Sequence, residues 1–171
     1  AQLAGDTVAY IDLMATFDPD YADRCGLDIQ RLLLVRPVNG REGLAICHSL
    51  IERRGAGFII FDNTPGLRDK SLGWRKLAPD LSQILRVLAR SRCVLVFLTP
   101  LSSSRNYPAG FALPNYATLR LQLRRERWIH KQHDIRGYQA QVIVLKNKLG
   151  RAGQTAQISI TFNGTVRGDS T

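Results

Sequence analysis

Two apolar runs of the sequence end in an aspartate, a placement typical of a ligand-binding edge. Thr7–Asp12 reads TVAYID, and Ala56–Asp62 reads AGFIIFD. Ligands bind beyond the carboxyl ends of the strands in open parallel α/β sheets, so Asp62 is a candidate to contact a bound ligand. The structural alternative is that Asp62 caps a turn together with Asn63.

A second group of side chains has the composition of a nucleic-acid contact. The segment Thr99–Asn115 is rich in Pro, Ser, Gly and Asn, which predicts a long loop, and its part Leu101–Leu113 carries Arg105, Tyr107 and Phe111. A basic residue among aromatic residues suits phosphate contact combined with base stacking. The alternative is a surface loop without a ligand. Further cations follow and predict a phosphate track: Arg120, Arg124, Arg125, Arg127 and Lys131.

The charge of the chain is unevenly distributed. The 171 residues carry a net charge of +10, with −3 in residues 1–67 and +13 in residues 68–171. Such asymmetry favours a polyanionic partner for the second part of the chain. The alternative is a basic surface with no partner.

Other functional classes have little support in the sequence. Cys25, Cys47 and Cys93 are widely spaced and form no ligand motif with the scattered histidines, so buried, reduced thiols are expected and a metal site is not. No apolar stretch is long enough to span a membrane. The first residues lack the pattern of a signal peptide, and a cytoplasmic location is therefore expected.

Apolar periodicity predicts the elements that position these side chains. Helices are expected over Pro19–Cys25, Arg41–Arg54 and Trp74–Arg90, between apolar runs suited to buried strands. This alternation predicts crossover connections and a parallel sheet. The expected fold is α/β, with a twisted, mainly parallel sheet, flanking helices, and antiparallel strands at the C-terminal edge. Strands are expected near residues 7–12, 31–35, 56–62, 93–98, 117–125, 139–148 and 155–162.

Five segments, in order along the chain, resemble the ATPase core of RecA-type recombinases. They are IDLMATFDPDYADRCGLDI from Ile11, GFIIFDNTPGL from Gly57, WRKLAPDL from Trp74, NYATLRLQLRR from Asn115, and Gln141–Phe162 with its Lys146-Asn147-Lys148. Each segment alone is a weak signal, but the ordered set is specific. It implies a RecA-like core over residues 1–162, followed by a polar tail over residues 163–171.

The resemblance implies roles for individual residues. Asp62 matches the Walker B acid, which helps to hold Mg²⁺ in P-loop enzymes. Asp18 and Tyr21 match the segment that holds adenine, although they also suit a helix cap and a packed ring. Lys146 and Lys148 match lysines that reach the neighbouring protomer's nucleotide, although they also suit a solvated strand face. Arg105, Tyr107, Phe111, Arg120 and Arg124 match the second DNA-binding loop and the strand after it.

The sequence also departs from the family pattern at points that matter for catalysis. Met14 stands where the family has its catalytic glutamate, and a thioether neither polarises water nor accepts a proton. Pro100 stands where the family has its nucleotide-sensing glutamine. The first DNA-binding loop, between Leu67 and Trp74, is short. The 171 residues contain no Walker A motif, GxxxxGK[ST].

Three interpretations remain open. The favoured one is a RecA-like accessory domain with little ATP hydrolysis, which binds single-stranded DNA or a recombinase or DNA polymerase partner. The second is a fragment of an active DNA-dependent ATPase that uses ATP and Mg²⁺, with its Walker A motif upstream of Ala1. The third is an interaction domain that binds neither nucleotide nor DNA.

Overall fold

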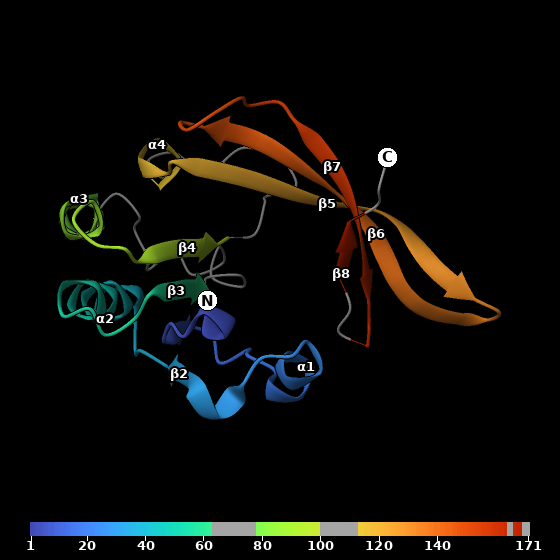
Figure 1. Ribbon diagram of the computed structural model, residues 1–171, viewed down its shortest axis with the longest axis horizontal. Helices are drawn as coiled ribbons and strands as arrows, with labels where there is room; N and C mark the ends of the chain where they lie inside the picture. Colours follow the sequence, from blue (N-terminus) through green and yellow to red (C-terminus); the bar gives the residue numbers. More distant parts are fainter. Residues whose placement is uncertain (63–77, 100–112, 164–165, 169–171) are drawn as a thin grey trace. The chain divides into compact units, whose positions relative to one another are not determined.

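The structure is a computed structural model, and it describes residues 1–62, 78–99, 113–163 and 166–168 (Figure 1). The chain forms two compact units. The first consists of Ala1–Asp18 and Asp28–Asn115, and the second of Pro19–Leu27 and Tyr116–Thr171. None of the described helices combines the length and apolar character needed to cross a membrane.

The first unit is built on a four-stranded parallel sheet. Its strands are β1 (Val8–Asp12), β2 (Leu32–Val35), β3 (Phe58–Asp62) and β4 (Val94–Leu98), in the order β2-β1-β3-β4. Along β1 and β3, Val8 pairs with Phe58 and Asp12 pairs with Asp62. The expectation that the two runs ending in aspartate share one parallel sheet is therefore confirmed.

Helices α2 (Gly40–Glu52) and α3 (Ala78–Leu88) pack against each other beside this sheet (Figure 1). Asn39 caps α2 by accepting a bond from the Glu42 amide at 3.0 Å, and the Glu42 carboxylate accepts one from the Val38 amide at 2.6 Å. Short 3-10 turns, η1 (Gln2–Ala4) and η2 (Ile29–Arg31), precede β1 and β2. The core comprises buried residues of the central strands and both helices: Val8, Ala9, Ile11, Ile59, Phe61, Leu44, Cys47, Ile51, Leu81 and Ile84.

The second unit contains a four-stranded antiparallel sheet in the order β5-β6-β7-β8. Strands β5 (Leu119–Lys131) and β6 (Asp134–Asn147) form a long hairpin (Figure 1), followed by β7 (Thr155–Thr161) and β8 (Val166–Gly168). Cross-strand partners share a face of the sheet. One face is mainly apolar, and the other carries polar and basic side chains, including the Arg120–Lys146 and Arg124–Gln141 pairs. Helix α1 (Pro19–Arg24) belongs to this unit, and α4 (Leu113–Tyr116) precedes β5.

The fold class predicted from the sequence is confirmed, with local differences. The antiparallel strands form a sheet of their own, and the β5–β6 hairpin is longer than expected. Residues 166–168, expected in the polar tail, form β8 and pair with β7. The expectation of three buried thiols is met only by Cys47, since Cys25 is exposed and Cys93 is half-buried. The boundary at residue 162 stays a prediction.

Candidate functional site

Two buried aspartates lie side by side at the carboxyl edge of the parallel sheet. Asp12 ends β1 and Asp62 ends β3, and the two residues are partners in the β1–β3 register. Asp12 is 1% exposed and Asp62 is 6% exposed. In the order β2-β1-β3-β4, the chain adds β2 on one side of β1 and then adds β3 and β4 on the other side. The aspartate pair on β1 and β3 therefore stands at the switch point, where open α/β sheets bind ligands.

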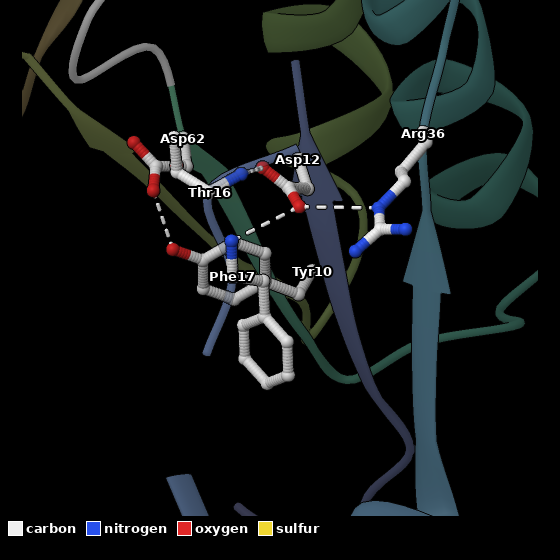
Figure 2. A network of polar contacts seen from close by, with 6 residues as sticks. All are labelled: Tyr10, Asp12, Thr16, Phe17, Arg36 and Asp62. Atoms are coloured by element: carbon white, nitrogen blue, oxygen red, sulfur yellow. Dashed lines mark hydrogen bonds and ion pairs between the residues drawn. The ribbon is translucent and has the colours of Figure 1, made fainter. Parts of the chain in front are cut away.

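The Asp12 carboxylate is held by donors from its own unit (Figure 2). It accepts hydrogen bonds from the amides of Thr16 at 2.9 Å and Phe17 at 3.1 Å. The Arg36 Nε, at the end of β2, lies 3.4 Å from Asp12 Oδ2. These three donors compensate the burial of a charged group, because they replace the water that it has lost. Asp12 therefore organises the turn after β1.

The Asp62 carboxylate is contacted by a tyrosine from the neighbouring strand. The Tyr10 hydroxyl donates to Asp62 Oδ2 at 2.5 Å (Figure 2), and Tyr10 lies two residues before Asp12, hence on the same face of the sheet. The Tyr10 ring also packs on Phe17, with 4.8 Å between ring centroids. Burial, and then the bond to Asp62, raises the pKa of Tyr10 far above its ordinary value. Tyr10 therefore remains a hydrogen-bond donor to Asp62.

Met14 follows β1 in the turn that Asp12 organises, and its side chain is 46% exposed. No proton-accepting side chain stands at this position. Asp12, two residues earlier, is buried and bonded to three donors. Among the described residues, no three His, Cys, Asp or Glu side chains gather closely enough to hold a metal ion.

The residues matched to adenine binding fall in different units. Asp18 is exposed and ends the first stretch of the first unit, whereas Tyr21 is half-buried on α1 in the second. The Arg24 guanidinium lies 5.8 Å from the centroid of the Tyr21 ring. Burial, and then the neighbouring Cys25, raises the pKa of Tyr21. Tyr21 thus has the surroundings of a packed ring, and adenine contact by Asp18 and Tyr21 stays a prediction.

The antiparallel sheet brings several of the predicted cations together. Arg120 and Lys146 are cross-strand partners, and Lys148 follows two residues after Lys146, its amide donating to the Thr118 carbonyl at 2.9 Å. Desolvation lowers the pKa of Lys146, and the adjacent Lys148 and Arg120 lower it further. Mutual repulsion of this kind favours an anion among the three side chains.

Arg124 lies further along the same strand and is exposed. The other predicted DNA-contacting residues, Arg105, Tyr107 and Phe111, lie outside the described residues, and so does Pro100. Their roles stay predictions.

Sequence reasoning did not assign functional roles to Tyr10, Asp12 and Arg36. Asp12 has the same signal as Asp62, an acid at the end of an apolar strand. Tyr10 could have been found from the two-residue period of a strand, which places it on the face of Asp12. Arg36 directly follows β2, and only the strand order brings it next to β1.

These features define an open parallel α/β unit with an acidic edge at its switch point, linked to a basic antiparallel sheet. The chain belongs to the RecA family, because residues 1–167 match the RecA N-terminal domain. Protein RecA of Rickettsia africae is 31% identical over 186 residues, which cover 97% of this chain and 54% of that relative. Protein RecA of Roseiflexus castenholzii is 28% identical over 183 residues, which cover 95% and 52%. The chain thus spans about half the length of these relatives.

Solved structures agree on the fold. The RadB recombinase superposes with a TM-score of 0.62 at 22% identity, and the superposition covers 96% of this chain and 79% of the RadB chain. The KaiC-like protein PH0186 from Pyrococcus horikoshii superposes with a TM-score of 0.67 at 14% identity, covering 99% and 79%. At these identities the likeness establishes the architecture alone.

Proposed function

We propose that this chain is a RecA-like DNA repair and recombination domain that binds single-stranded DNA and hydrolyses little or no ATP. The observation that carries the proposal is the state of the acidic edge. Met14 stands at the position of the family's glutamate, and the two remaining acids are buried and bonded. A general base must accept a proton from the water that it activates, and it must be able to reach that water. Met14 cannot accept a proton, and the carboxylates of Asp12 and Asp62 are buried and already hydrogen-bonded.

The family resemblance implies ATP and Mg²⁺, and the described residues fit that pair poorly. Asp62 is the positional match to the metal-binding acid, but its Oδ2 already accepts the Tyr10 hydroxyl. Asp12 Oδ2 faces the Phe17 amide and Arg36, and its Oδ1 faces the Thr16 amide. Mg²⁺ requires near-octahedral oxygen ligands, which a carboxylate bonded in this way does not readily provide.

DNA binding is supported by the antiparallel sheet. Its basic face carries Arg120, Arg124 and Lys146, and the part of the chain from residue 68 has a net charge of +13. Cations on a flat face can follow a phosphate backbone without reading its sequence. Such a role also fits the cytoplasmic location expected from the sequence.

The hydrolysis part of the proposal is tested by measuring phosphate release from ATP and Mg²⁺ with the 171-residue chain, with and without single-stranded DNA. We expect no turnover above the buffer background in either case. Asp62→Ala is the matched control, because it removes the acid that any residual P-loop chemistry would need. Turnover that DNA stimulates and that Asp62→Ala abolishes contradicts the proposal.

A second candidate function is that of a fragment of an active, DNA-dependent ATPase. It is favoured by the length of the relatives, of which this chain covers about half, and by the retained Asp62. The encoded sequence upstream of Ala1 separates the two candidates. A GxxxxGK[ST] motif within about one strand and turn of Ala1 would restore a phosphate cradle to the protein.

A further inference from the structure

Three aromatic rings from three separate strand positions gather on the apolar face of the antiparallel sheet. Trp128 on β5 and Tyr138 on β6 are cross-strand partners. Phe162 directly follows β7, and its backbone N–H donates a hydrogen bond to the Arg136 carbonyl at 2.9 Å. The Trp128 ring centroid lies 6.0 Å from that of Tyr138 and 6.5 Å from that of Phe162, and Tyr138 and Phe162 are 6.4 Å apart. These three residues are the aromatic triad.

The triad is not a core cluster, because much of it remains in contact with solvent. Trp128 is 41% exposed and Phe162 is 46% exposed. The Arg125 guanidinium carbon lies 4.1 Å from the centroid of the Trp128 ring, a cation–π contact. Tryptophan is the ring most suited to stacking against a flat, charged or polarised group, and here one such group already lies over it.

The charges around the triad favour a polyanion over a protein surface. Residues 124–138 contain five Lys or Arg and two Asp or Glu, so this part of the hairpin carries a net charge of +3. Arg125 shares the face of the triad, whereas Arg124 and Arg127 lie on the opposite face of the same edge strand, β5. Both acids are engaged: Glu126 accepts a bond from the Gln157 side chain, and Asp134 pairs with Arg136 at 3.1 Å. The cores of protein–protein interfaces are depleted in charged residues, whereas strand-binding surfaces combine cations with exposed rings.

We propose that the aromatic triad is a base-stacking site for single-stranded nucleic acid, with Trp128 as the platform and Arg125 as the phosphate contact beside it. The proposal rests on the proposed DNA-binding function and adds to it a contact on the opposite face of the sheet. The edge strand β5 carries both Arg124, on the basic face, and Arg125 and Trp128, on the face of the triad, so one nucleic-acid strand that passes around this edge can reach both. A base stacks on the exposed indole, and Arg125 moves from the ring to the adjacent phosphate. Because every base has a π face, the site is indifferent to sequence.

The test uses the intrinsic fluorescence of Trp128. The chain has two tryptophans, so Trp74→Phe leaves Trp128 as the sole indole. Titration with a fluorophore-labelled oligothymidylate at low salt reports total binding by anisotropy and stacking by quenching of the indole. We expect saturable quenching with the same midpoint as the anisotropy change.

Substitutions separate stacking from charge. Trp128→Ala should weaken binding by about tenfold with an unchanged salt dependence, because stacking releases few counterions. Trp128→Phe should retain most of the affinity, and it serves if the alanine variant fails to fold by circular dichroism. Arg125→Ala should weaken binding and make its salt dependence shallower. Leu149→Ala is the matched control, since it removes an 87%-exposed apolar side chain beyond the opposite end of β6.

The outcomes distinguish this inference from the function on which it rests. Oligonucleotide binding that leaves the Trp128 emission unchanged overturns the stacking site and keeps the DNA-binding function. Absence of any anisotropy change at low salt overturns the DNA-binding function, and the stacking site with it; the triad then becomes a protein-docking surface.

Discussion

The hydrogen bond between Tyr10 and Asp62 joins two neighbouring strands at the edge where the site lies. Tyr10→Phe removes one donor from a carboxylate that is 6% exposed. We expect a loss of about 1–2 kcal/mol in the free energy of unfolding, since a charged acceptor loses a bond that water replaces poorly. Denaturant unfolding measures it. Tyr138→Phe is the control, and an equal loss in both variants would show that the Tyr10 bond contributes nothing specific.

The three thiols differ in exposure and should differ in reactivity toward an aromatic disulfide reagent. Cys25 is exposed, Cys93 is half-buried, and Cys47 is buried. Burial raises the pKa of Cys93, and burial together with Cys93 raises the pKa of Cys47 to about 12. Because the thiolate is the reactive form, we expect the order Cys25, then Cys93, then Cys47. Variants that keep one cysteine each assign every phase of the reaction with the reagent to one thiol. A fast reaction of Cys47 would contradict the burial of this α2 side chain.

The same burial predicts an alkaline loss of stability. The folded chain retains the Cys47 proton above pH 9.0, where the unfolded chain releases it. Stability from this group is therefore complete below the unfolded pKa and falls as pH rises from 9.0 toward about 12, by at most about 1.4 kcal/mol per pH unit. Cys47→Ala should have a flatter stability profile in this range than the unsubstituted chain, even though its stability at neutral pH is lower.

At the residue scale, the sequence predicted Asp62 at a strand end but not its contact with Tyr10. An apolar strand ending in an acid is a local signal, so reading the chain finds it. The Tyr10 contact joins residues 52 positions apart and depends on the pairing of β1 with β3. Met14 was found because the family pattern assigns its position, and no local signal marks it.

Among the strands, the β6–β7 pair depends on a glycine. A Cβ on Gly137 would lie 2.1 Å from the Ile160 carbonyl oxygen, closer than side-chain atoms approach a backbone. Gly137→Ala should therefore displace β7 from β6 and destabilise the chain by about 3 kcal/mol, as other backbone clashes do.

Gly168→Ala is the matched control for that variant. Gly168 lies in β8 of the same sheet, and its added Cβ would meet nothing within 4 Å. We expect a change within about 0.5 kcal/mol, typical of a surface substitution. Thermal unfolding of both variants decides the point, and equal stabilities would show that the sheet shifts at no cost.

At the element scale, the predicted ends of helices and strands were accurate where a local sequence feature, such as a capping residue, marks them. Helix α2 was expected over Arg41–Arg54 and runs over Gly40–Glu52, because Asn39 provides a clear cap. The first strand of the β5–β6 hairpin was expected to end at residue 125, because the alternation of Leu119, Leu121 and Leu123 with polar residues stops at Arg125. In the structure, a bulge between Arg125 and Arg127 takes up Glu126, and the strand continues to Lys131. The full length of this hairpin therefore depends on the pairing between the strands, which the periodicity of a single strand does not reveal.

At the scale of the whole molecule, charge is divided along the chain, with −3 before residue 68 and +13 from there on. Binding to single-stranded DNA through this part should depend steeply on salt, since each neutralised phosphate releases counterions. If about four phosphates are contacted, the slope of log affinity against log salt should be about −3, at ~0.7 per phosphate. Fluorescence anisotropy over a salt series measures this slope.

Single substitutions then assign the slope to positions. Arg105→Ala and Arg124→Ala should each weaken binding to all sequences and make the slope shallower by about 0.7, the value for one phosphate. Tyr107→Ala should weaken binding with little change in slope, because a stacked base is uncharged. Arg53→Ala removes an exposed cation from the end of α2 in the other unit, so it should leave both affinity and slope unchanged. If Arg53→Ala lowers the slope as much as Arg124→Ala does, the binding follows net charge alone and no interface exists on the antiparallel sheet.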